Sequence, residues 1–272
     1  MKTFMKAIFI ALPFALMVGC SDDDDNTIVP PTNDSLALTH NYFDYSNVLG
    51  GSFREFRTDV NNGEVDGTEV SGTFNYDKDT LVNGKTARLY IRTENSGDAE
   101  YREYSYMTLD SNEYYINSGA LNDIVYTISA GTGLQINLPF ILPDMMIKIG
   151  DRKNTSWTSF TQDFNNFEVT NYAGTSVTAS GNLTVKGTRG QAEIISTETS
   201  KEYSQYFNIL ITFDGTISLD PATKRTLIAY FSYKFTEGKG ITKVSVPFST
   251  FDIMTGLSYP LNGFTRIITL NK

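Results

Sequence analysis

The chain has 272 residues, a formal net charge of −9, one cysteine and one histidine. Because phosphate binding needs clustered Lys and Arg, we expect no nucleic-acid partner for so acidic a chain. One thiol forms no disulfide within the chain, and one histidine cannot supply the ligand set of a zinc site. We therefore expect no metal, no cofactor and no catalytic residue, and we interpret His40 as a surface or packing side chain.

Residues 1–19 are predicted to be a signal peptide. Lys2 and Lys6 give the chain a positively charged start, and residues 7–18 are uncharged and almost wholly apolar. This apolar core of about 12 residues is too short to cross a bilayer, which needs about 20. The alternatives are a secretory signal removed by the ordinary peptidase and a buried hydrophobic element.

Residues 16–20, Leu-Met-Val-Gly-Cys, resemble a bacterial lipobox, although Met17 stands where that pattern usually has Leu. The resemblance implies that Cys20 carries palmitate-type acyl chains and becomes the new N-terminus. The acidic run that follows is similar to the export signal of Bacteroidota outer-membrane lipoproteins. That similarity implies a lipid anchor in the outer membrane, facing either the periplasm or the cell surface. The predicted modified residue is Cys20, and the predicted export signal is Ser21, Asp22, Asp23, Asp24 and Asp25.

Cleavage before Cys20 removes two lysines and no acid, so the remaining 253 residues carry a net charge of −11. Residues 20–35 form the acylated cysteine and a disordered tether, because they are acidic, contain proline and lack aromatic residues. A short edge strand at residues 27–29 is the alternative. Residues 36–272 are predicted to form a single all-β domain.

Apolar and polar residues alternate through most of residues 36–272, which is typical of antiparallel strands with one buried face. One such run is Phe207, Ile209, Ile211, Phe213 and Ile217, and another is Leu227, Ala229, Phe231, Tyr233 and Phe235. Turn residues are found at 83–84, 96–98, 220–223 and 237–240. The best helix candidates are short, at 144–149 and 159–167. We expect a β-sandwich or one strongly curved sheet.

A faint internal repeat suggests two duplicated halves, at about 36–150 and 151–272. It aligns residues 70–74 with 179–183 and residues 101–109 with 203–211. Chance similarity between β-rich segments is the alternative.

The remaining candidate sites have simple structural interpretations. Residues 59–67 carry acids and Asn but lack the glycine position and the flanking helices of an EF-hand, so we expect a solvated hairpin loop. Residues 77–80 are expected to form a polar turn. Tyr104 and Tyr106 share one strand face, where they could stack on sugars or stabilise an exposed sheet.

The sequence favours a non-catalytic binding or scaffolding role at the cell envelope, with a protein, glycan or lipid as partner beside the membrane that holds Cys20. Residues 235–244 are similar to a strand–Gly-x-Gly–strand element of Bacteroidota lipoproteins, which implies only fold and location. One alternative is a carrier of an apolar ligand or lipid, resembling LolA and LolB. A second is a surface glycan-binding module, or a glycan hydrolase that uses carboxylates alone.

Overall fold

The computed structural model describes residues 39–43, 48–95, 100–107, 112–117, 135–137, 146–172, 175–197, 199–218, 220–247, 249–254, 257–261 and 263–270. The predicted signal peptide, Cys20, the acidic run at 21–25 and the tether to residue 35 lie outside these ranges. They stay predictions. No helix in the described part of the chain is long and apolar enough to cross a membrane.

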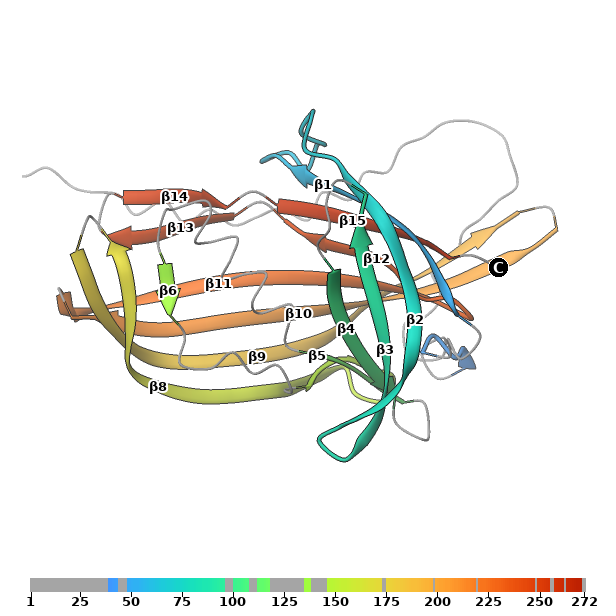
Figure 1. Cartoon of the computed structure of the whole chain (residues 1–272), viewed down its shortest axis with the longest axis horizontal. Coiled ribbons are helices and arrows are strands. Elements are labelled where there is room, and N and C mark those ends of the chain that lie inside the picture. The colour runs from blue at the N-terminus through green and yellow to red at the C-terminus, as the bar shows by residue number, and fades with distance from the viewer. Residues whose placement is uncertain are drawn as a thin grey trace, which may run out of the picture. The chain divides into compact units, whose positions relative to one another are not determined.

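All fifteen elements in these ranges are β-strands (Figure 1), which confirms the predicted all-β fold. The strands are β1 (Gly50–Thr58), β2 (Val70–Val82), β3 (Lys85–Glu94), β4 (Glu100–Met107), β5 (Glu113–Asn117), β6 (Gln135–Asn137), β7 (Met146–Asp151), β8 (Ser156–Tyr172), β9 (Thr175–Ser196), β10 (Lys201–Ile217), β11 (Asp220–Thr236), β12 (Gly240–Val246), β13 (Ser249–Met254), β14 (Leu257–Leu261) and β15 (Gly263–Leu270).

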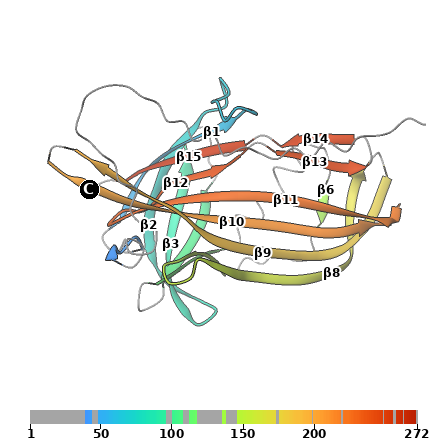
Figure 2. The same cartoon turned by 180° about the vertical axis from the view of Figure 1, so that it is seen from behind.

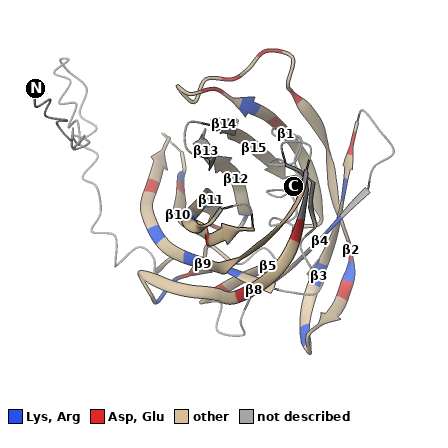
Figure 3. Ribbon diagram, turned by 90° about the vertical axis from the view of Figure 1, so that its left-hand side faces the viewer, with Lys and Arg blue, Asp and Glu red and all other residues tan. Residues whose placement is uncertain are grey.

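Thirteen strands form one sheet in the order β6-β8-β9-β10-β11-β12-β15-β1-β2-β3-β4-β5-β7, and β13 and β14 pair separately. Every pairing is antiparallel, and most neighbours in the sheet are also consecutive in the chain. The ribbons of this sheet follow an arc in Figure 3, so the strongly curved sheet is the architecture that forms. Curvature of this kind follows from the right-handed twist of long strands.

The segments aligned by the faint repeat do not occupy equivalent places in the sheet. Residues 70–74 lie in β2 and residues 101–107 in β4, and β3 lies between these two strands. Their counterparts lie in β9 and β10, which are direct neighbours. The described strands therefore give this alignment no structural support.

Strands β8, β9, β10 and β11 run side by side over most of their length (Figures 1 and 2). The alternation predicted for β10 and β11 is confirmed at 207–211 and 231–235, where the odd-numbered residues face the core. The buried members are Phe207, Ile209, Ile211, Phe231, Tyr233 and Phe235. Because each buried aromatic or aliphatic side chain contributes about 1.5–3 kcal/mol, this inner face supplies much of the fold's stability.

The two helix predictions are wrong, and β-bulges explain the second. Residues 144–149 overlap β7, and residues 159–167 lie in β8. Phe160, Phe164 and Phe167 are spaced like one face of a helix. In the sheet, register shifts between Thr158 and Phe160 and between Phe164 and Phe167 change which alternate residues of the strand face the core.

Two of the predicted turns also need correction. Residues 77–80 continue strand β2, which turns into β3 only at Asn83 and Gly84, both with positive φ. That pair matches the two-residue hairpin turn, which requires positive φ at both positions. Residues 220–223 already belong to β11, and Asp220 pairs with Ile217. The turn at 237–239 is confirmed, and the prediction at 96–98 lies outside the described residues.

Candidate functional site

The sheet's last strand, β7, lies against the first half of β8, and we call this junction the β7–β8 seam. Strand β8 pairs with β9 along its length and with β6 only at 168–170. Among the described residues, β7 pairs through its backbone with β5 but has no backbone pairing with β8. The seam must therefore be closed by side chains.

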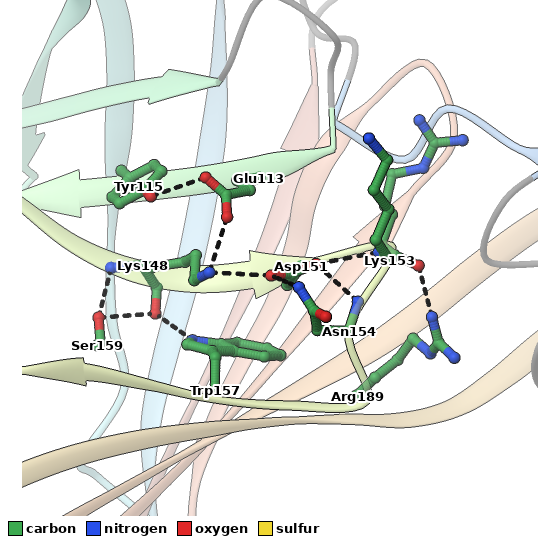
Figure 4. A network of polar contacts seen from close by, with 10 residues as sticks. Glu113, Tyr115, Lys148, Asp151, Lys153, Asn154, Trp157, Ser159 and Arg189 are labelled. Atoms are coloured by element: carbon green, nitrogen blue, oxygen red, sulfur yellow. Dashed lines mark hydrogen bonds and ion pairs between the residues drawn. The ribbon is translucent and has the colours of Figure 1, made fainter.

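Two side chains of β8 take the place of a backbone ladder (Figure 4). Trp157 Nε1 donates to the carbonyl oxygen of Lys148 at 2.9 Å. Ser159 Oγ accepts from the backbone N–H of Lys148 at 2.7 Å and donates to the same carbonyl at 3.2 Å. Both backbone groups of one β7 residue are thus satisfied by neighbouring side chains, as buried backbone polar groups require.

The side chain of Lys148 lies at the centre of a charged cluster that it forms with Glu113 and Asp151. Its Nζ is 2.8 Å from Glu113 Oε1 on β5 and 2.9 Å from Asp151 Oδ2 at the end of β7. It also lies 5.7 Å from the centre of the Trp157 ring, within the range of a cation–π interaction. Lys148 is only 14% exposed and Asp151 1%, so this ion pair is largely shielded from water.

The Asp151 carboxylate is fully used by hydrogen bonds. Oδ1 accepts from the backbone N–H groups of Lys153 and Asn154, at 3.0 and 2.8 Å. Oδ2 accepts from Asn154 Nδ2 at 2.9 Å as well as from Lys148. Burial favours the neutral acid, but the bonds from Asn154 and Lys148 outweigh it and hold the pKa of Asp151 below its ordinary value.

The pKa of Lys148 shifts in the opposite direction, upward. Burial disfavours its charged form, but hydrogen bonds and charge attraction from Glu113 and Asp151 raise the pKa of Lys148 above its ordinary value. Lys148 and Asp151 are therefore both charged at neutral pH. The hydrogen bonds that Asp151 accepts from Lys153 and Asn154 stabilise the turn between β7 and β8.

A second element closes the same region from inside. We call residues 39–43 the strap. Its side chains Tyr42 and Phe43 are completely buried. The Phe43 ring centre lies 5.0 Å from that of Phe235, 5.3 Å from Phe207 and 5.5 Å from Tyr114. These are ordinary distances for edge-on and tilted aromatic contacts.

Phe43 also rests directly on the backbone of β7. A Cβ added at Gly150 would lie 2.5 Å from the Phe43 ring, closer than atoms of that kind approach. Glycine is therefore required for this contact. Phe43 touches β5 and β7 directly, and it reaches β8 through Phe207 of β10, whose ring centre lies 6.4 Å from that of Trp157.

The outer end of the strap binds the turn after β11. His40 Nδ1 lies 3.0 Å from Glu237 Oε2, and the backbone N–H of Asn41 donates to Glu237 Oε1 at 3.3 Å. The His40 ring stacks on Tyr203, with ring centres 3.7 Å apart and planes tilted by 17°. The packing interpretation of His40 fits this geometry. A polar contact this exposed contributes at most about 1 kcal/mol.

The strap also buries polar atoms that gain no partner. Tyr42 Oη and Asn41 Oδ1 have no hydrogen bond in the described part of the structure. Burial raises the pKa of Tyr42 to about 12, reinforced by the charge of Glu237 and opposed by that of Arg152. Each unsatisfied buried group costs about 1–3 kcal/mol, so docking of the strap is weaker than its buried area suggests.

The predicted acidic loop at 59–67 forms a compact turn. Asp59 Oδ1 accepts from the backbone N–H groups of Asn61 and Gly63, both at 2.8 Å, and Glu64 binds Arg54. Across the described ranges, no group of three or more His, Cys, Asp or Glu side chains could hold a metal ion.

Among the other tyrosines, Tyr114 lies in the core beside Phe43, and Tyr115 donates to Glu113 Oε2 at 2.9 Å. The side chains of Tyr104 and Tyr106 lie outside the described part, so their predicted outward orientation stays a prediction.

Sequence reasoning missed the seam residues. Asp151 and Asn154 have the spacing of a side-chain-capped turn, and Trp157 is the only tryptophan of the chain. These two features of the sequence could have pointed to the seam. The partners Glu113 and Lys148 are 35 residues apart, and no local pattern connects them.

No protein-family model matches the chain, and no curated protein matches it at a significant level. Among solved structures, the chain is similar to "a putative lipoprotein from Parabacteroides distasonis ATCC 8503". The TM-score is 0.44 at 10% sequence identity, and the match covers 85% of this chain and 99% of the other.

Proposed function

We propose that the chain is a lipid-anchored lipoprotein of the outer membrane with a non-catalytic binding or scaffolding role. The observation that carries this proposal is the sequence of residues 16–25, in which an apolar leader ends at Gly19-Cys20 and an acidic run follows. Several acyl chains on one cysteine would hold the protein on a membrane, whereas a single chain binds only marginally.

The geometry of the strap supports the same proposal. The strap begins 19 residues after Cys20, and its Phe43 is packed among aromatic rings of the sheet. A tether of that length reaches at most about 65 Å when fully extended. The β domain would thus be held near the membrane but free to meet a partner there.

A non-catalytic role is supported by the state of the buried acid. Asp151 has all its acceptor positions occupied and a lowered pKa, whereas a glycosidase needs an acid whose pKa is raised. Lys and Arg are scattered over several strands in Figure 3, which supports a partner other than nucleic acid.

The packing of β10 favours scaffolding over the carrier alternative. A carrier needs an apolar cavity along this strand, but Phe207 is completely buried against the rings of Phe43, Phe235 and Trp157. The inner face at this end of β10 is filled by the protein's own side chains. An acyl chain would have to displace them.

The proposal is tested by replacing Cys20 with Ala in cells fed a labelled fatty acid. We expect Cys20→Ala to lose the label and to leave the membrane fraction, while the matched variant Ser21→Ala keeps both. Firm membrane attachment of Cys20→Ala, equal to that of the parent, would contradict the anchor.

A further inference from the structure

We propose that the strap, residues 39–43, is a releasable element that holds the β7–β8 seam closed. Undocking the strap opens the seam, while the backbone ladders that join β9, β10 and β11 stay intact. This inference concerns the folded domain alone and does not depend on the lipid anchor.

The first support is the position of Phe43 between the two sides of the seam. Its ring contacts Tyr114 and the backbone at Gly150 on β5 and β7, and also Phe207 of β10, which packs against Trp157 of β8. Because protein interiors are close-packed, withdrawal of this ring removes the inner support of β7.

The second support is the way in which β7 is attached. Within the described residues, β7 is joined to β8 through the side chains of Trp157 and Ser159, without a backbone ladder. Strand β10, in contrast, pairs along most of its length with both β9 and β11. The seam is therefore the junction that can separate without breaking a ladder.

The third support is that the strap buries polar atoms whose hydrogen bonds to water are not all replaced by the described residues. Tyr42 Oη and Asn41 Oδ1 lose water on burial and gain no hydrogen bond from the residues that the structure describes. At its outer end the strap depends on Glu237, whose side chain is 39% exposed. Elements with unsatisfied or exposed contacts have the lowest free energies of local opening.

The test is hydrogen exchange of the full chain, resolved by segment. We expect Phe43→Ala to speed exchange of 146–151 and 156–160 about tenfold, with 207–211 changing far less. The matched control is Phe53→Ala, which empties a similar volume where Phe53 packs over Gly72 on β1 and β2. This control should leave the seam segments as protected as in the parent.

Two milder variants keep the test decisive if Phe43→Ala does not fold. Tyr42→Phe removes an unpaired buried hydroxyl, so the strap should dock more tightly and seam exchange should slow about threefold. Glu237→Gln weakens the outer end, so seam exchange should rise about twofold to threefold. Unchanged seam exchange in both, or an equal rise in every strand of Phe43→Ala, would overturn the proposal.

Discussion

The β7–β8 seam and the ladder of β9, β10 and β11 are two junctions of one curved sheet, closed by different means. The ladder is held by backbone hydrogen bonds in long continuous registers, which most residue types can form. The seam depends on the side chains of Ser159 and Trp157, on Asp151, which fixes the turn that leads from β7 into β8, and on Phe43 from the strap. Single substitutions should therefore act selectively at the seam, whereas the ladder should respond only to changes in its buried face.

The largest effect is expected from Asp151→Ala. This change leaves Lys148 with one carboxylate partner and removes the acceptor of the Lys153 and Asn154 backbone N–H groups. Breaking a shielded ion pair from one side costs about 3 kcal/mol. Urea unfolding measures the loss. The control Asp214→Ala alters an exposed residue of β10 and should change the free energy of unfolding by about 0.5 kcal/mol. Equal effects of the two variants would mean that the cluster does not stabilise the seam.

A smaller effect is expected from Ser159→Ala. The backbone N–H of Lys148 then has no acceptor at the seam, while its carbonyl still accepts from Trp157. An unsatisfied donor of this kind costs about 1–2 kcal/mol. Thr161→Ala, at an exposed position two residues along β8, is the matched control. If both variants unfold at the same urea concentration as the parent, the hydrogen bond from Lys148 to Ser159 does not contribute to the free energy of unfolding.

The smallest effect concerns pH. Because the folded-state pKa of Asp151 is lowered, its contribution is full above the unfolded pKa of about 3.9 and is lost as pH falls through the folded value. Because the pKa of Lys148 is raised, its contribution is full below about 10.4 and is lost as pH rises through the folded value. The difference in unfolding free energy between parent and Asp151→Asn should therefore shrink in acid. A difference that stays constant from neutral pH to pH 3 would contradict the assigned ion pair.

The sequence predicted the ladder much better than the seam, for a physical reason. Alternation in β10 and β11 is a local pattern that reports burial on one face, and the structure follows it at 207–211 and 231–235. In β8, bulges place Phe164 and Phe167 on the buried face three positions apart, which imitates a helix. The seam cluster joins residues from β5, β7 and β8, and only the folded sheet brings them together.

The only tryptophan, Trp157, lies at the seam, where its indole N–H donates to Lys148 and its ring packs against Phe207 of β10, so its fluorescence responds directly when the seam opens. The most direct test follows urea unfolding of the full chain by Trp157 fluorescence and, in parallel, by far-ultraviolet circular dichroism, which reports the ladders. If the seam is the weaker junction, fluorescence changes at a lower urea concentration than circular dichroism, because the two probes see different openings. Coincident transitions with equal slopes would show that seam and ladder unfold as one unit and would contradict this account.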